Sequence, residues 1–297
     1  MKKNVLGLYL SDRVAQSLVL EPNADRWTLH ALAEWPNRLF SYAGDDTPGM
    51  DEFVEHLSTF LSQKALPVHT AAVALDTGLL FVNTIPIEDP SAPPLIEEQI
   101  AWELSEYFPD SPHNAFISDY ETMLKPDSRP YTEVLAVSVR REFVQKIQRA
   151  MKRLNLQLGV VDGDHFGAAT AMRMNHPETA RKRVLLAGVK QERVDISVLQ
   201  HDGMESYCYR MISTDEDIVH ALAAETQRHD APPSLVVFGD RLDEQLVGEL
   251  RAALSTPVHV LDPFHIVTVD TSLRLKSDPT ARSFRYAAAV GVALRQK

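Results

Sequence analysis

Two carboxylates and an imidazole stand together in the segment Asp162-Gly163-Asp164-His165, and side chains of these types bind divalent metal ions in many proteins. A metal site needs a third and a fourth ligand, for which the sequence offers no obvious source. The two aspartates have a simpler structural role, because their oxygens can accept the free backbone N–H groups at the start of a helix near His165. We therefore expect a helix cap here and no bound metal.

No other segment has the spacing of a known catalytic motif. The sequence lacks a Gly-x-Ser-x-Gly turn, a Walker-type phosphate loop and a zinc-protease helix, and its 11 histidines do not recur at ligand spacing. Cys208 is the single cysteine, which excludes an intramolecular disulfide and a cysteine-based metal cluster and is typical of a reducing compartment. These observations favour a binding protein and leave an enzyme as the alternative.

Composition and charge narrow the choice of partner. The chain has 297 residues, of which 44% are hydrophobic, and this is enough for two domains with separate cores. The formal net charge of -11 argues against nucleic acid as the main partner, because phosphate binding depends on clustered Lys and Arg. No window approaches the roughly 18 apolar residues of a membrane helix, so we expect a soluble, cytoplasmic chain. The basic residues that cluster, which we interpret as a solvated helix face, are Arg140, Arg141, Lys146, Arg149, Lys152 and Arg153.

The segment 95–108 predicts an amphipathic helix, around which the rest of the chain can be organised. Its apolar residues recur at helical spacing, whereas Trp102 falls among the glutamates of the polar face. Two alternating segments, 116–124 and 131–139, predict strands, and a second amphipathic helix follows them. The order helix, strand, strand, helix indicates an inserted α-β-β-α subdomain at about 88–156.

The remaining elements occur twice in the same order, which indicates two ribonuclease-H-like lobes. We predict an α/β protein with a first lobe over 1–165, including the insert, and a second over 166–297. The last helix, over 283–295, is rich in small residues, so we expect it to pack tightly between the lobes. The predicted strands are 5–10, 15–21, 27–35 and 70–75, then 184–189, 194–200, 205–212, 235–238 and 258–261, with helices over 51–61, 216–228 and 242–254.

Five segments of the chain form a recognisable series. They are IEEQIAWELSEYFP from Ile96, DYE from Asp119, EVLAVSVRREFVQKIQRAMKRLNLQLGVVDGDHFGAATA from Glu133, LDPF from Leu261 and YAAAVGVALRQ from Tyr286. In sequence and order this series resembles the PilM family of type IV pilus assembly. The resemblance implies an actin-like duplicated fold of two lobes around a nucleotide cleft, with the α-β-β-α insert in the first lobe.

The resemblance also shows where a nucleotide would bind and how the chain departs from that pattern. Actin-like ATPases hold phosphates in two hairpin turns, where glycines allow close approach and aspartates organise Mg²⁺. The first turn reads approximately Asp-Ile-Gly-Ser-Ser-Ser in PilM proteins, whereas here Tyr9 replaces the aspartate and Ser11 the glycine. The residues that we assign to this degenerate nucleotide-binding site are Ser11, Asp12, Arg13, Asp162, Asp164, Gly188, Lys190, Gly239 and Asp240.

Each missing charge-assisted contact would remove about 1.5–3 kcal/mol of nucleotide binding. We therefore expect no cofactor and a nucleotide site that does not function. The alternative is an ATPase that binds or slowly hydrolyses ATP with magnesium, in which Asp12, Asp162 and Lys190 replace the usual ligands.

PilM proteins dock the short cytoplasmic N-terminal tail of an inner-membrane protein, PilN, between the first lobe and the inserted subdomain. The resemblance thus implies a cytoplasmic scaffold that lies at the inner membrane through this partner, with self-association left open. Since aromatic side chains supply much of the energy of peptide binding, we expect Phe81, Trp102, Tyr107 and Phe108 to line the groove. A second alternative is a relative of the cytoplasmic domain of the type II secretion protein GspL, which is also actin-like.

Overall fold

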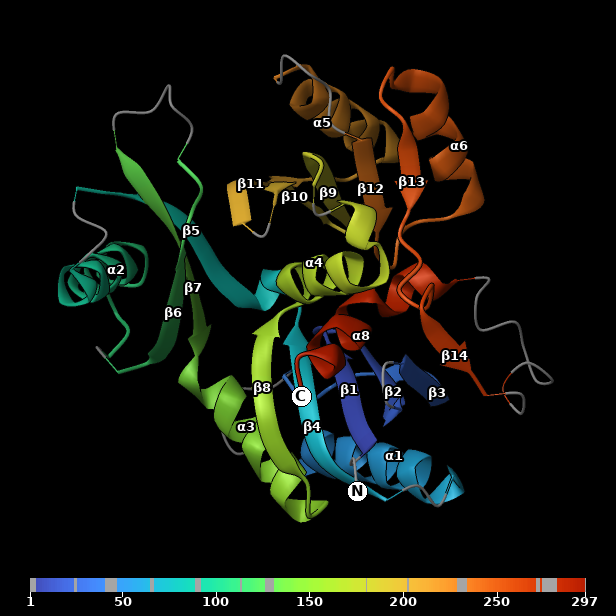
Figure 1. Ribbon diagram of the computed structural model, residues 1–297. Helices are drawn as coiled ribbons and strands as arrows, with labels where there is room; N and C mark the ends of the chain where they lie inside the picture. The colour runs from blue at the N-terminus through green and yellow to red at the C-terminus, as the bar shows by residue number, and fades with distance from the viewer. Residues whose placement is uncertain are drawn as a thin grey trace.

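The computed structural model shows five stacked layers, in which helices, a sheet, helices, a second sheet and helices follow one another (Figure 1). A smaller sheet with its own helix stands beside this stack (Figure 1). We call the lower sheet with its outer helices the first lobe, the upper sheet with its outer helices the second lobe, and the smaller unit the subdomain. The structure describes residues 4–23, 26–40, 47–64, 67–88, 92–112, 114–125, 131–179, 181–201, 203–228, 234–270, 273 and 282–296.

The first lobe has a six-stranded sheet in the order β14-β3-β2-β1-β4-β8. All seven residues of β1 are buried, because α1 and α3 cover one face of the sheet and α8 covers the other. β14 pairs in parallel with β3 although it lies late in the chain, and the sequence analysis did not predict it. The elements are β1 Asn4–Leu10, β2 Val14–Asn23, β3 Arg26–Pro36, α1 Thr47–Lys64, β4 Val68–Leu75, α3 Arg141–Arg153, β8 Gln157–Gly163 and β14 Val267–Val269.

The second lobe repeats this plan with a five-stranded sheet in the order β11-β10-β9-β12-β13. Its outer helices α5 and α6 begin at side-chain caps, where Thr214 and Asp243 accept backbone N–H groups of the first turn. The predicted duplication of element order is therefore confirmed. The elements are β9 Val184–Val189, β10 Arg193–Gln200, β11 Gly203–Met211, α5 Asp215–Gln227, β12 Ser234–Phe238, α6 Glu244–Ala253 and β13 Val258–Val260.

Two helices, α4 (Asp164–Asn175) and α8 (Ala287–Leu294), lie between the sheets. Their contact is so close that a Cβ added to Gly291 would lie 1.7 Å from the carbonyl oxygen of Gly167. Only glycine therefore fits at the crossing. The predicted tight packing of the last helix is confirmed, and the short helices η2 Pro177–Thr179 and η3 Ser283–Tyr286 follow α4 and precede α8.

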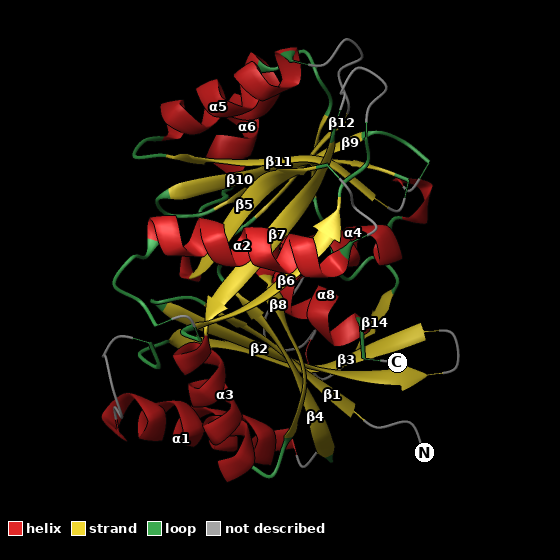
Figure 2. Cartoon of the chain, turned by 90° about the vertical axis from the view of Figure 1, so that its left-hand side faces the viewer, coloured by secondary structure: helices red, strands yellow, loops and turns green. Residues whose placement is uncertain are grey.

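The subdomain has a three-stranded sheet in the order β5-β7-β6, with α2 across its outer face (Figure 2). Ile96, Ile100 and Leu104 of α2 are buried against this sheet, as the amphipathic pattern predicts. The unit differs from the expected insert at both ends, because it gains β5 and because α3 packs against α1 in the first-lobe core. Its elements are η1 Thr77–Leu79, β5 Leu80–Ile87, α2 Pro93–Tyr107, β6 Phe116–Thr122 and β7 Thr132–Arg140.

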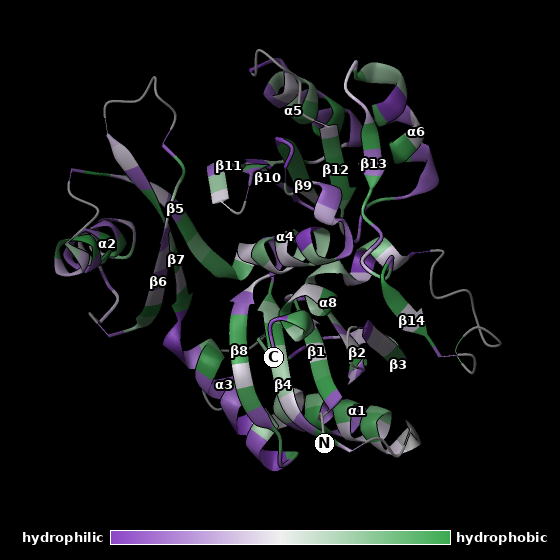
Figure 3. Cartoon of the chain, viewed as in Figure 1, coloured by the Kyte–Doolittle hydropathy of each residue, from purple (hydrophilic) through white to green (hydrophobic). Residues whose placement is uncertain are grey.

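Hydropathy follows these layers. Apolar residues concentrate in the strands of the two large sheets, whereas the outward side of α3 is hydrophilic (Figure 3). Within the described parts of the chain, no helix is both long and apolar enough to cross a membrane.

Candidate functional site

The two turns that would flank a phosphate chain contact each other directly. In the first turn the Ser11 backbone N–H donates to the Val14 carbonyl over 2.9 Å, and the Ser11 hydroxyl oxygen accepts the Val14 N–H over 2.9 Å. In the second turn, between β9 and β10, the Glu192 carboxylate lies 2.5 Å from the Arg13 guanidinium. Asp12 is exposed, and its nearest charged partner is Arg13, at 3.7 Å. Ser11 thus closes its own turn, and the N–H groups of Ser11, Arg13 and Val14 are used within it.

Lys190, which follows β9, is the centre of the cleft between the lobes. Its ammonium nitrogen lies 3.2 Å from Oδ1 of Asp76, 2.8 Å from Oδ2 of Asp164 and 3.0 Å from Oδ2 of Asp195. It also donates to the hydroxyl of Thr77. Asp76 follows β4 and Asp164 begins α4, so both belong to the first-lobe sheet edge, whereas Asp195 lies on β10 of the second lobe. Lys190 therefore connects the two lobes.

The carboxylates around Lys190 accept further hydrogen bonds, which hold them in place. Asp195 accepts the Thr77 hydroxyl over 2.7 Å, Arg193 Nε over 2.8 Å and the Tyr207 hydroxyl over 2.5 Å. Asp164 accepts the Thr77 backbone N–H over 2.9 Å. We call Asp76, Thr77, Asp164, Lys190, Arg193, Asp195 and Tyr207 the interlobe cluster. Tyr9, in the place of the family's aspartate, donates its hydroxyl to Asp76 over 2.7 Å.

Burial and charge act in opposite directions on these groups. Burial alone would lower the pKa of Lys190, but the charges of Asp164, Asp195 and Asp76 raise it well above its ordinary value. Burial would raise the pKa of Asp195, yet Lys190 and Arg193 lower it. Asp164 differs, since burial with the neighbouring carboxylates raises its pKa to about 7 against the opposing effect of Lys190. The lysine is therefore charged at neutral pH, and the cluster binds one proton readily.

The space for a nucleotide beside this cluster is almost closed. A cavity of about 10 Å³ remains, roughly the room of one water molecule, whereas ligand pockets measure about 300–1,000 Å³. Gly239 has φ of 127°, and a Cβ there would lie 2.1 Å from the Val189 carbonyl oxygen. The residues present therefore do not fit a nucleotide in this arrangement of the lobes. The lining residues are Tyr9, Asp164, Lys190, Phe238, Gly239, Asp240, Arg285 and Ala288.

Asp162, His165 and Gly188 each contact different neighbours. Asp162 forms an ion pair with Arg295, and His165 Nε2 lies 2.8 Å from the Ser197 hydroxyl. Burial lowers the pKa of His165 to about 4, so the ring is neutral at pH 7. Gly188 lies within β9, where a Cβ would meet the ring of Phe238 at 2.8 Å.

The predicted helix cap at the start of α4 is wrong. Gly163 occupies the N-cap position, and no side chain there accepts a hydrogen bond from the first turn. Asp164 is already the first helical residue, and its carboxylate is used by Lys190 and by the Thr77 N–H. Asp162 instead accepts the Gly163 N–H over 2.8 Å. The Asp164 carboxylate therefore binds Lys190, which is distant in the sequence, and does not cap its own helix.

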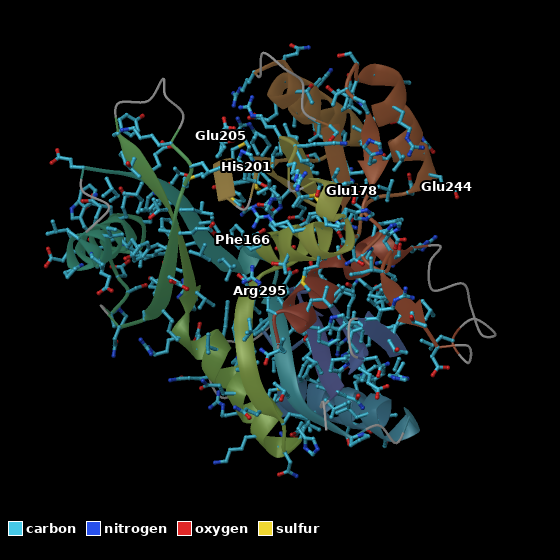
Figure 4. All side chains as sticks on the ribbon, viewed as in Figure 1. Phe166, Glu178, His201, Glu205, Glu244 and Arg295 are labelled. Atoms are coloured by element: carbon cyan, nitrogen blue, oxygen red, sulfur yellow. The ribbon has the colours of Figure 1, made fainter. Side chains whose placement is uncertain are left out.

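An open groove lies beside the end of β8, between the subdomain and the first lobe. Its volume is about 570 Å³, and most of its lining side chains are apolar. Figure 4 shows Phe166 of α4 and Arg295, near the C-terminus, on the side of the lobes that faces the subdomain. The lining residues are Leu75, Leu80, Ile117, Ser118, Asp119, Tyr120, Glu121, Leu135, Val137, Val139, Val144, Val161, Asp162, Gly163, Phe166 and Arg295.

The four aromatic residues expected in this groove lie elsewhere on the subdomain. Phe81 packs against Tyr107 with ring centroids 5.0 Å apart, and against Phe108 at 5.8 Å. Trp102 is 54% exposed and Tyr107 is 61% exposed. Phe108 borders a second cavity, of about 450 Å³, between α2 and β6. None of the four is among the described residues that line the groove.

The sequence analysis did not identify several members of the interlobe cluster. Asp195 lies between the buried apolar residues Val194 and Ile196, and a buried charge in a strand interior is a signal that could have been used. Asp76 directly follows the fully buried segment 71–75 and therefore lies at a strand end beside the cleft. Arg193 and Tyr207 carry no comparable signal, because both residue types are common at half-exposed strand positions.

Comparison with solved structures defines the class of protein. The chain superposes on a chain of the PilM–PilN type IV pilus biogenesis complex with a TM-score of 0.78, at 16% identity and over 98% of both chains. A Bacteroides thetaiotaomicron protein with an actin-like ATPase fold gives 0.55 at 16% identity, over 92% of this chain and 95% of that one. The fold is therefore actin-like, and the predicted resemblance to PilM is confirmed at the level of the fold.

A third likeness is to a secretion protein. The cytoplasmic domain of EpsL, an inner-membrane component of the type II secretion system of Vibrio cholerae, gives a TM-score of 0.55 at 14% identity, over 99% of this chain and 96% of that one. No protein-family model and no curated protein sequence matches the chain. The similarity to these proteins thus lies in the fold.

Proposed function

We propose that this chain is a PilM-like scaffold of the inner-membrane platform of a type IV pilus or a related secretion machine. In this proposal it binds the cytoplasmic N-terminal segment of a PilN-like membrane protein in the groove between the subdomain and the first lobe. It would thereby lie on the cytoplasmic side of the membrane through that partner.

The observation that carries this proposal is the free edge of β6 in the groove. β6 pairs with β7 on one side, and the described residues provide no strand on its other side. Five consecutive residues, 117–121, line the groove, so both faces of the strand and its edge border it. A free edge of this kind accepts an extended peptide through backbone hydrogen bonds, and the apolar pocket beside it accepts alternate side chains.

The charges of the groove favour a peptide that carries a basic side chain. Asp119, Glu121 and Asp162 are acidic, whereas Arg295 is the basic residue among the described lining groups and already forms an ion pair with Asp162. A lysine or arginine of the partner would therefore meet uncompensated negative charge.

A titration with a synthetic peptide tests the docking proposal. The peptide has the cytoplasmic N-terminal sequence of the PilN-like protein encoded in the same genome, and its affinity is measured by calorimetry. Ile117 is 38% exposed in the groove, so Ile117→Arg should weaken binding at least about tenfold and leave Tm within roughly a few degrees.

The Trp102→Ala variant separates the groove from the aromatic residues on α2. A loss of affinity in Ile117→Arg with little change in Trp102→Ala supports the groove. The reverse result would move the binding site to the residues around Trp102, as the sequence predicted. Unchanged affinity in both variants, or no binding to the unmodified protein, would contradict the docking proposal.

We further propose that the chain acts without ATP, so that catalysis is not its function. The nearly closed cavity and the use of Lys190 by three carboxylates support this. Titration of the purified protein with Mg-ATP should release no heat at millimolar concentration. Micromolar binding that disappears in Asp164→Ala would instead establish the ATPase alternative.

A further inference from the structure

We propose that Lys190 is a built-in cation that takes the place of a magnesium–nucleotide ligand and holds the two lobes closed. Three carboxylates of the cleft surround a single position, and the chain places its own ammonium group there. Closure of the lobes is then a permanent property of the fold, independent of any ligand.

The first support is the geometry of the ammonium group. Its nitrogen lies within 3.2 Å of carboxylate oxygens from Asp76, Asp164 and Asp195, which follow β4, begin α4 and lie on β10. These distances are those of charge-assisted hydrogen bonds. Since Lys190 and Asp195 belong to the second lobe, the contacts with Asp76 and Asp164 cross the cleft.

The second support is the charge balance around it. The cluster holds three carboxylates, and the other cation in contact with it, Arg193, pairs with Oδ1 of Asp195, whereas Lys190 pairs with Oδ2 and with Asp76 and Asp164. Without Lys190 the two first-lobe carboxylates would face Asp195 with no cation between them, in a site where these side chains are at most 16% exposed. Uncompensated buried charges of like sign force either protonation or separation of the lobes.

The third support comes from the turn at Ser11 and from the small cavity beside Lys190. The backbone N–H of Ser11 is used within its own turn, and the cavity beside Lys190 has a volume of about 10 Å³, far below that of a nucleotide pocket. The site therefore has carboxylates that bind a cation, and the Ser11 N–H is not free to bind a phosphate. An amine is the ligand that such a site suits.

The experiment is chemical rescue of Lys190→Ala. Propylammonium reproduces the atoms that this substitution removes, so it should restore the missing cation. We expect Tm to fall by roughly 5–15 °C in the variant and propylammonium chloride to recover most of this fall in a saturable manner, beyond the effect of equal sodium chloride. Lys152→Ala, at an exposed position of α3, is the control and should show neither effect.

Hydrogen exchange reports closure of the lobes directly. Amides of residues 76–79 and 189–193 should exchange faster in Lys190→Ala and slow again with propylammonium, while those of α6, away from the cleft, stay constant. In the unmodified protein neither Mg-ATP nor a chelator should change these rates. A Tm within 2 °C of the unmodified protein, or a cleft in that protein that closes only with Mg-ATP, would overturn the proposal.

A second variant covers the case in which Lys190→Ala does not fold. Lys190→Met with Asp164→Asn removes one positive and one negative charge together and nearly preserves volume. We expect this double variant to be more stable than Lys190→Met alone, because the substitutions compensate each other. Equal or greater destabilisation in the double variant would show that Lys190 acts by packing and would contradict the proposed cation.

Discussion

The cleft between the lobes and the groove beside the subdomain both border the end of β8, and they differ in polarity and in volume. Asp164 points into the cleft, while Asp162, two residues earlier, borders the groove. The cavity beside Lys190 in the cleft has about 10 Å³ and four charged lining residues, whereas the groove has about 570 Å³ lined mainly by apolar side chains. In this actin-like fold, charged side chains from both lobes therefore meet in the cleft, while the space beside the subdomain stays open.

The largest expected difference between the two regions concerns stability. Asp195→Ala should lower the free energy of unfolding by about 3–5 kcal/mol, because Lys190 and Arg193 lose a buried partner. Asp119→Ala, at an exposed position in the groove, should change it by less than about 0.5 kcal/mol. Urea unfolding of both variants measures the difference. Similar free energies of unfolding for the two variants would show that the buried ion pairs of the cleft do not stabilise the fold.

The next effect is a dependence on pH that arises in the cleft alone. The pKa of Asp164 is raised from 3.8 to about 7 in the folded chain, so between these values the folded state binds more protons than the unfolded state. The free energy of unfolding should therefore fall as pH rises from about 4 to about 7, by on the order of 2–4 kcal/mol, and its Asp164 contribution should be constant above that. Urea unfolding at several pH values measures this slope.

Asp164→Asn is the control for this slope, since its side chain does not titrate. The difference in slope between the two proteins isolates Asp164 from the histidines and other carboxylates. A slope that persists unchanged in Asp164→Asn would assign it to another group. Asp195 has a lowered pKa, so its contribution is lost only as pH falls below about 4, outside this window.

A smaller effect should follow from substitution of two glycines. Gly239→Ala should lower the free energy of unfolding by about 1–3 kcal/mol, because φ is 127° and the Cβ would meet the Val189 carbonyl. Gly248, exposed in α6, has no atom within 4 Å of such a Cβ, so Gly248→Ala should raise stability by about 0.5–1 kcal/mol. Opposite signs in thermal unfolding would confirm that the turn at Gly239 is closed by backbone contact. Equal signs would contradict it.

The smallest effect is expected for the exposed ion pair across the cleft. Arg13 and Glu192 are both more than 60% exposed, so water screens their attraction. Arg13→Ala should leave Tm and the hydrogen exchange of the cleft unchanged. A clear opening of the cleft in this variant would transfer the role of interlobe connection from Lys190 to the surface pair.

The regular elements could be predicted because their signals are local. Burial produces a pattern within a short stretch of sequence in each of three elements. These patterns are the buried residues of β1, the apolar spacing of α2 and the small residues of α8. The exceptions depend on distant partners. β14 has three residues and exists because β3 offers an edge, and α3 joins the first lobe because its apolar face meets α1.

The sequence by itself determined the duplicated order of elements, the residue types Tyr9 and Ser11 in the first turn and the placement of Trp102 on a polar helix face. Only the tertiary structure decided which charged side chains meet between the lobes. Asp76, Asp164, Lys190 and Asp195 are spread over 120 positions of the chain, and their interaction depends on strand ends that meet across two lobes. Electrostatic energy depends on distance in space and on burial, and neither quantity can be read from a residue's neighbours in sequence.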